Sequence, residues 1–320
     1  MQREFEIRSL SRRLRLGPGE RWAACASLCY ALTNTLLRAS IKPDQAPDPV
    51  IAAILRLLPV TALAWLLTFI ANRTGDFRPG SARFAGWRAV LAVLLAGLSS
   101  YFAGNTAYQL ALNHGGVGVT VPVAQSASLW GGILMGSLFL GEQHAPQVAY
   151  GGLVVMAGLV LLSTARSSGT LLNWTAALPL AAIAGASYAL SNILMRSAFQ
   201  RGMGQFPGLA LNALSGLSVL LMAAWLRLGF DIFARTTPDT IVALLSAGVF
   251  NAGALFSLSR ALTLTTAGRV NTINTATIAL STLLAAILFG EPLTMPIGLG
   301  ILLTIGGILL VQRHLASARA

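Results

Sequence analysis

Long apolar runs alternate with short polar segments along almost the whole chain. Ten of these runs are long enough to cross a bilayer as helices, because about 20 residues at ~1.5 Å each span ~30 Å of hydrocarbon. Strands of a membrane barrel would be shorter and would alternate in polarity. The pattern therefore predicts an all-α integral membrane protein with ten transmembrane helices. Their expected limits are Trp22–Ala39, Val50–Ala71, Trp87–Leu110, Gly116–Leu140, Gln147–Ala165, Trp174–Phe199, Phe206–Gly229, Thr240–Leu262, Gly268–Phe289 and Met295–Gln312.

The composition agrees with this reading. Of the 320 residues, 55% are hydrophobic and only 10% are charged, and the mean hydropathy is +0.71. A soluble globular chain carries about 25% charged residues, so a soluble enzyme is excluded. The two cysteines, Cys25 and Cys29, share one helix face four residues apart, and we expect them to be packing residues.

The net charge of +12 would ordinarily point to nucleic acid, but the positions of the cations indicate membrane orientation instead. With the N-terminus in the cytoplasm, 16 of the 22 Lys and Arg residues fall on the cytoplasmic side, as the positive-inside rule requires. The sequence predicts an Arg-rich cytoplasmic tail over 1–21, a cytoplasmic tail over 313–320, and no nucleic-acid partner. Short connections between spans, such as Asn113–Gly115, predict antiparallel neighbours.

The chain also repeats itself. Tyr30–Arg38 aligns with Tyr188–Arg196 at an offset of 158 residues, with Tyr, Ala, Leu, Asn, Leu and Arg identical. Leu140–Glu142 aligns with Phe289–Glu291 at an offset of 149. At the second offset two pairs of glycines also coincide, Gly151 with Gly300 and Gly158 with Gly307. The order of the matches is preserved, which indicates an internal duplication.

The duplication divides the spans into two repeats of five, over 22–166 and 167–312. Because five is odd, the second repeat enters the membrane from the opposite side, and a pseudo-two-fold axis in the membrane plane relates the two. This inverted arrangement suits alternating access around a central site. A duplication without a transport role is the alternative.

Several of these features together resemble the drug/metabolite transporter superfamily, in its ten-span branch of two EamA-type domains. They are the five-plus-five repeat, the Tyr/Ala/Leu/Asn pattern of the first and sixth spans, the small residues at Gly115–Gly118 and Thr266–Gly268, Pro122, and the Gly-Glu endings. The resemblance covers about Trp22 to Gln312. It implies a metabolite exporter of a bacterial inner membrane, with amino acids as a common substrate class.

Groups that drive catalysis or proton coupling are missing from the predicted spans. All ten Asp and Glu residues and all three His residues lie in predicted loops or tails, whereas proton pumps need a membrane-embedded acid or His. No Walker-type phosphate loop occurs. The sequence therefore predicts a protein that is not an enzyme, that uses no cofactor or metal, and that moves its substrate down a gradient.

The polar residues inside the spans are neutral. An amide exposed to lipid costs several kcal/mol, so we expect these side chains to face inward around a shared cavity that binds a small metabolite. For any single Asn, a hydrogen bond between helices is the alternative. The candidate substrate-binding residues are Tyr30, Asn34, Tyr101, Asn105, Pro122, Gln125, Trp130, Tyr188, Asn192, Asn251, Asn271 and Asn274.

Other residues allow two interpretations. Pro122 kinks its span, either to free a backbone carbonyl for substrate or only for packing. Arg56 is expected to reach an interface, with carboxylate binding as its alternative. Arg38 and Arg196 are expected to be interfacial anchors.

The frequent glycines of the fourth, fifth and tenth spans predict close helix contacts, within one chain or across a weak dimer. A channel-like pore for small polar solutes is the alternative function. A membrane enzyme or receptor is a third and weaker possibility.

Overall fold

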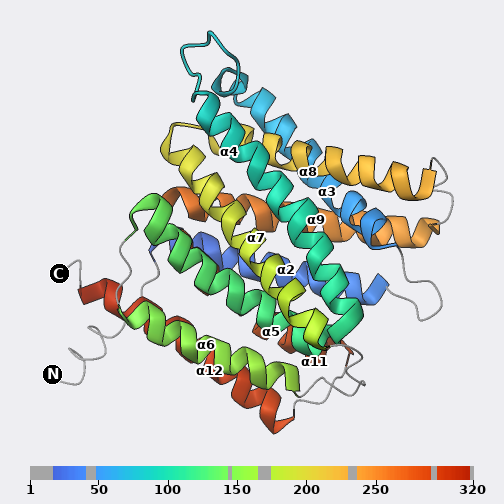
Figure 1. Ribbon diagram of the computed structural model, residues 1–320, viewed down its shortest axis with the longest axis vertical. Coiled ribbons are helices and arrows are strands. Elements are labelled where there is room, and N and C mark those ends of the chain that lie inside the picture. Colours follow the sequence, from blue (N-terminus) through green and yellow to red (C-terminus); the bar gives the residue numbers. More distant parts are fainter. Residues whose placement is uncertain are drawn as a thin grey trace.

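The computed structural model describes residues 17–40, 48–142, 146–164, 174–229, 236–289 and 294–317. All regular secondary structure in these ranges is helical, and the helices lie side by side in one bundle (Figure 1). The bounds are α2 (Pro18–Ser40), α3 (Pro49–Ile70), η1 (Thr74–Asp76), α4 (Trp87–Gly97), η2 (Leu98–Gly104), α5 (Asn105–Leu140), α6 (Pro146–Thr164), α7 (Trp174–Gln200), α8 (Gln205–Leu228), α9 (Pro238–Leu264), α10 (Ala267–Asn274), α11 (Ala276–Phe289) and α12 (Met295–Ser317).

The described helices include seven that are long and apolar enough to cross a membrane: Val50–Ile70, Trp87–Tyr108, Val123–Leu140, Thr175–Gln200, Gln205–Arg227, Pro238–Leu264 and Ala267–Leu288. Val148–Leu161 and Met295–Ile308 are shorter apolar helices. α2 is a 23-residue helix, but polar residues such as Thr33 and Asn34 lower its hydropathy. The chain is therefore a helical membrane protein, while the count of ten spans stays a prediction.

The outer surface of the bundle is rich in apolar side chains, as expected for a surface that faces lipid. Large apolar side chains such as Phe69, Leu138 and Ile287 are well exposed, where a soluble protein would place charges. The interior is built largely from alanine, with Ala23, Ala89 and other alanines fully buried. Small side chains let helices approach closely, which is how helices associate in a membrane.

One predicted connection between spans is wrong, because the structure is helical at that place. Asn113–Gly115 lies inside α5, which is helical from Asn105 to Leu140. The preceding span is instead interrupted at η2, a seven-residue π-helix between α4 and α5. Wide helical turns of this type occur often at functional sites.

α6 and α12 lie against each other along their lengths (Figure 1). A Cβ built on Gly158 would lie 2.7 Å from the Gly300 carbonyl oxygen, and one built on Gly307 would lie 2.7 Å from that of Gly151. At the 149-residue offset, Gly158 is equivalent to Gly307 and Gly300 is equivalent to Gly151. The two contacts are therefore the same contact made twice, with the roles of the two helices exchanged. The later residue of α6 meets the earlier part of α12 and vice versa, which makes the two helices antiparallel. A local two-fold axis perpendicular to both helices therefore relates them.

Other helix contacts also have an equivalent contact in which the two halves of the chain change places. α4 and η2 pack against α7 as α9 packs against α2, and α5 packs against α7 as α10 and α11 pack against α2. Gly97 of α4 lies against the Asn212 backbone, and Gly248 of α9 lies against the Arg56 backbone. Arg56 and Asn212 are thus equivalent positions in α3 and α8.

Candidate functional site

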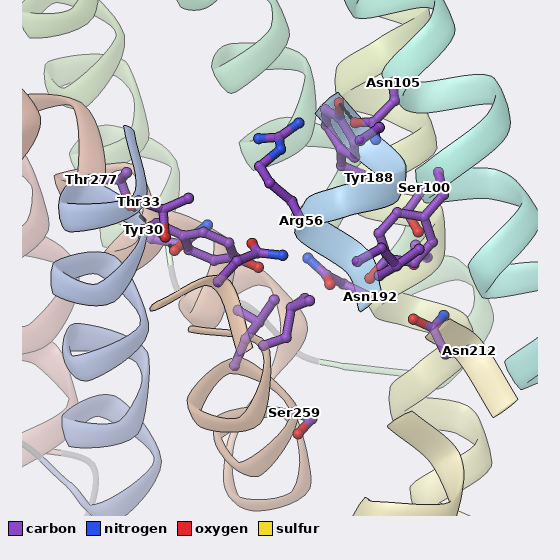
Figure 2. Close-up of a pocket in the computed structure, with 18 of the residues that line it drawn as sticks. Tyr30, Thr33, Arg56, Ser100, Asn105, Tyr188, Asn192, Asn212, Ser259 and Thr277 are labelled. Carbon is purple, nitrogen blue, oxygen red and sulfur yellow. Dashed lines mark hydrogen bonds between the residues drawn. The ribbon is translucent and has the colours of Figure 1, made fainter. Parts of the chain in front are cut away.

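A cavity of about 510 Å³ lies inside the bundle. Its walls come from α2, α3, η2, α5, α7, α8, α9, α10 and α11, so both halves of the chain contribute (Figure 2). Cavities of this volume are in the range that holds small molecules. The polar wall residues are Tyr, Asn, Gln, Ser, Thr and one Arg, and the wall contains no Asp, Glu or His among the described residues.

The structure brings nine of the twelve predicted site residues to this cavity. They are Tyr30, Asn34, Tyr101, Asn105, Gln125, Tyr188, Asn192, Asn251 and Asn274. They were expected to face inward because of the cost of exposing amides to lipid, and this is where they lie. That they bind substrate stays a prediction.

The other three residues lie differently. Trp130 donates its indole N–H to the sulfur of Met156 at 2.9 Å, between α5 and α6 and away from the cavity wall. Asn271 donates to the Ser128 carbonyl at 3.0 Å and accepts from Asn192 at 2.6 Å, so it joins α10 to α5 and α7. Pro122 lies within α5, and its side chain is outside the described residues.

The cavity wall is built from equivalent residues of the two repeats. At the 158-residue offset, Tyr30 corresponds to Tyr188, Thr33 to Ser191 and Asn34 to Asn192, and all six line the cavity. At the 149-residue offset, Gln125 corresponds to Asn274 and Ser128 to Thr277, and these four line it too. The cavity therefore lies where the two repeats meet.

Equivalent residues nevertheless have different partners. The Tyr188 hydroxyl donates to Asn105 Oδ1 at 2.8 Å, whereas the Tyr30 hydroxyl has no hydrogen bond within the described part of the chain. Asn192 is fixed by Asn271, while the more exposed Asn34 donates to Ser281 Oγ at the longer distance of 3.3 Å. Of these two pairs, the residues of the second repeat therefore make the shorter hydrogen bonds.

Arg56 does not reach an interface, contrary to the expectation. It lines the cavity, and Figure 2 shows its guanidinium extending from α3 into the space bordered by Tyr30 and Tyr188. Apolar residues cover most of α3, so hydropathy alone does not reveal which face carries Arg56. Its charge was the available signal, because charged side chains within membrane spans almost always face the bundle interior. Thr33, Ser191 and Thr277 were also missed as site residues, although Thr33 and Ser191 each lie one helical turn after a cavity tyrosine.

An ion pair lies next to the cavity wall. Arg196 of α7 pairs with Glu142, directly after α5, and its side chain is 14% exposed. Its guanidinium also donates to the carbonyl oxygens of Leu262 at 2.7 Å and of Thr265. Arg196 therefore links helix ends, and its role as an interfacial anchor stays a prediction. The Arg38 side chain lies outside the described residues.

A bundle of apolar helices around a polar, ligand-sized cavity defines a membrane transport protein. The model of the EamA-like transporter family matches the chain twice, over residues 17–164 and 175–313. The chain belongs to this family, whose members are transporters of small molecules and not enzymes. The resemblance to the drug/metabolite transporter superfamily is thereby confirmed.

Two further comparisons agree with this assignment. The uncharacterized protein PA1977 of Pseudomonas aeruginosa is 28% identical over 290 residues, which cover 89% of this chain and 91% of the relative. A solved crystal structure of a protein matches with a TM-score of 0.74 at 17% identity, covering 92% of this chain and 96% of the other. The structural match shows the fold alone.

Proposed function

We propose that the chain is a secondary transporter that exports small metabolites, with amino acids as the main class, and that the central cavity is its substrate site. The observation that carries the proposal is the position of the cavity between the repeats, with equivalent residues of both repeats in its wall. A site on the axis between two related halves is the arrangement that alternating access requires, because each half can move against the other around it.

The chemistry of the wall supports amino acids. Neutral amides and hydroxyls offer hydrogen-bond donors and acceptors to both ends of a zwitterion. Tyr30, Tyr101, Tyr108 and Tyr188 add apolar ring surfaces that suit aromatic and other apolar side chains. The faces of these rings also attract an ammonium group.

The membrane arrangement belongs to the same proposal. Ten spans form two inverted repeats over 22–166 and 167–312, in a bacterial-type inner membrane, with both termini in the cytoplasm. The antiparallel, reciprocal contact of α6 with α12 supports the inversion, and the excess of Arg on one predicted side supports the orientation. That contact lies within one chain, which supports a monomeric or weakly dimeric transport unit.

Transport of a radiolabelled amino-acid panel by proteoliposomes tests this function. We expect saturable uptake that is stimulated by counterflow, reduced in Asn34→Ala and unchanged in Ser137→Ala, an exposed residue whose hydroxyl donates to its own helix. Transport of no panel member would overturn the amino-acid assignment. An ohmic current in place of counterflow would favour a channel-like pore. A C-terminal reporter that is active outside the cell would overturn the topology.

A further inference from the structure

We propose that Arg56 is the carboxylate anchor of the central cavity, so that the protein takes small carboxylates, with or without an ammonium group, and excludes organic cations. This inference rests on the proposed function, because it assumes that the cavity is the substrate site. It extends the substrate class from amino acids to their analogues that lack the amine.

The first step is the free end of the Arg56 side chain. Its Nε donates to the Ala52 carbonyl of the preceding turn at 3.3 Å. Neither terminal nitrogen has a hydrogen-bond partner within the described residues, and the side chain lines the cavity. A guanidinium presents parallel N–H donors that match the two oxygens of a carboxylate. The backbone contact orients this fork and leaves it available to a ligand.

The second step is the charge balance of the cavity. No carboxylate lies in the described wall, and the Asp48 carboxylate at the start of α3 is occupied elsewhere. It accepts the Val50 N–H at 2.8 Å and lies 3.7 Å from Arg227. A cation without a counter-ion inside a membrane protein is costly. An anionic ligand supplies the missing charge, whereas a cationic ligand would be repelled.

The third step is the difference between the two repeats. Asn212 occupies the position in α8 that Arg56 occupies in α3, and it also lines the cavity. It is only 4% exposed, and its Nδ2 has no hydrogen-bond partner among the residues that the structure describes. A buried donor without a partner costs about 1–3 kcal/mol, and a ligand acceptor would satisfy it. The carboxylate of the ligand thus lies on the side of the first repeat, and a neutral acceptor lies toward the second.

A phosphate group could in principle use the same guanidinium. It carries up to two negative charges and three acceptor oxygens, and sites for it gather several cations or a helix N-terminus. Arg56 is the one cation in the described wall. The charge of the site therefore favours a carboxylate over a phosphate monoester.

The test uses the full-length protein and four ligands that share a phenyl ring: phenylalanine, 3-phenylpropionate, phenethylamine and phenyl phosphate. Thermal stabilisation of the purified protein in detergent reports binding, and counterflow in proteoliposomes reports transport. We expect phenylalanine and 3-phenylpropionate to stabilise the wild type and to exchange. Phenethylamine and phenyl phosphate are expected to do neither. Equal stabilisation by the amine, or preference for the phosphate, would overturn the proposal.

Variants then assign the effect to Arg56. In Arg56→Gln we expect the affinity for both carboxylates to fall by about tenfold or more, as for loss of a hydrogen bond to a charged group. Arg56→Lys should keep part of the affinity because the charge remains. Arg260→Gln, an exposed change in α9, should behave as wild type. A folded Arg56→Gln with unchanged carboxylate affinity would overturn the anchor.

Failure of the anchor and failure of transport give different results. Wild-type exchange of phenylalanine with an equally active Arg56→Gln would remove the anchor and keep the transporter. Arg56-dependent binding without any exchange would keep the anchor and remove the transport function. If Arg56→Gln does not fold, the preference of the wild type between the carboxylates and the amine still decides the proposal.

Discussion

Arg196 and Glu142 form an ion pair that joins the two repeats at one end of the bundle. Glu142 follows α5 of the first repeat and also accepts the Ala267 N–H at the start of α10 at 3.2 Å. Arg196 lies in α7 and donates to carbonyl oxygens at the end of α9. Four helix ends therefore meet at one charge pair. Met195 precedes Arg196 and Leu262 accepts from it, and both residues line the cavity, so the pair lies next to the cavity wall.

Breaking this pair from one side should destabilise the protein strongly. The Glu142 side chain is 4% exposed, and removal of one partner of a buried pair costs about 3–5 kcal/mol because the other charge is left unpaired. We expect Arg196→Gln and Glu142→Gln each to lower the thermal unfolding midpoint in detergent. The double variant should lose less than the sum of the two. Additive losses, or a loss as large in the exposed Arg201→Gln control, would contradict direct coupling.

The sequence predicted the helical segments better than it predicted which face of each helix points into the bundle. Hydropathy placed the predicted spans on helical segments, because backbone groups in lipid must bond within the segment, but it did not show that the third and ninth spans are each divided between helices. Hydropathy did not fix the rotation of α3, since lipid and neighbouring helices are both apolar, and a long Arg side chain near the end of a span can also reach an interface.

The same limit applies to the polar residues. The cost of exposing amides predicted that Asn271 faces inward. It gave no information on whether Asn271 would meet the cavity or, as the structure has it, Asn192 and Ser128. Internal homology was the stronger signal, because it pairs Tyr30 with Tyr188 and Gly158 with Gly307.

The contact between α6 and α12 allows a test of matched glycines. A Cβ on Gly307 would lie 2.7 Å from the Gly151 carbonyl oxygen, whereas one on the adjacent Gly306 would meet nothing within 4 Å. Gly307→Ala should destabilise the protein by about 1–3 kcal/mol, as overpacking does, and Gly158→Ala should cost a similar amount because the contact is reciprocal. Thermal unfolding measures both. Gly306→Ala is the control, and an equal loss in it would argue against this contact.

Asn271 and Asn34 should separate a structural role from a substrate role. Asn271 is buried and bonded to two other helices, so Asn271→Ala is expected to lower stability by about 0.6–1.7 kcal/mol. Asn34 is exposed to the cavity with one long hydrogen bond, so Asn34→Ala should leave the unfolding midpoint nearly unchanged. In counterflow, Asn34→Ala should raise the KM for phenylalanine. If Asn34→Ala instead lowered the stability and Asn271→Ala raised the KM, the two roles would have to be exchanged.

Transport should not depend on a proton gradient. The described wall of the cavity has no Asp, Glu or His, and proton-coupled carriers need such a group within the membrane. At a fixed phenylalanine gradient across proteoliposomes, we expect the same initial rate with and without an imposed pH difference. The rate should also survive a protonophore with the membrane potential clamped. A known proton-coupled carrier in parallel vesicles verifies that the gradient is present. Uphill accumulation of phenylalanine driven by the pH difference alone would show that a proton travels with the substrate, and the gradient-driven mechanism would then be wrong.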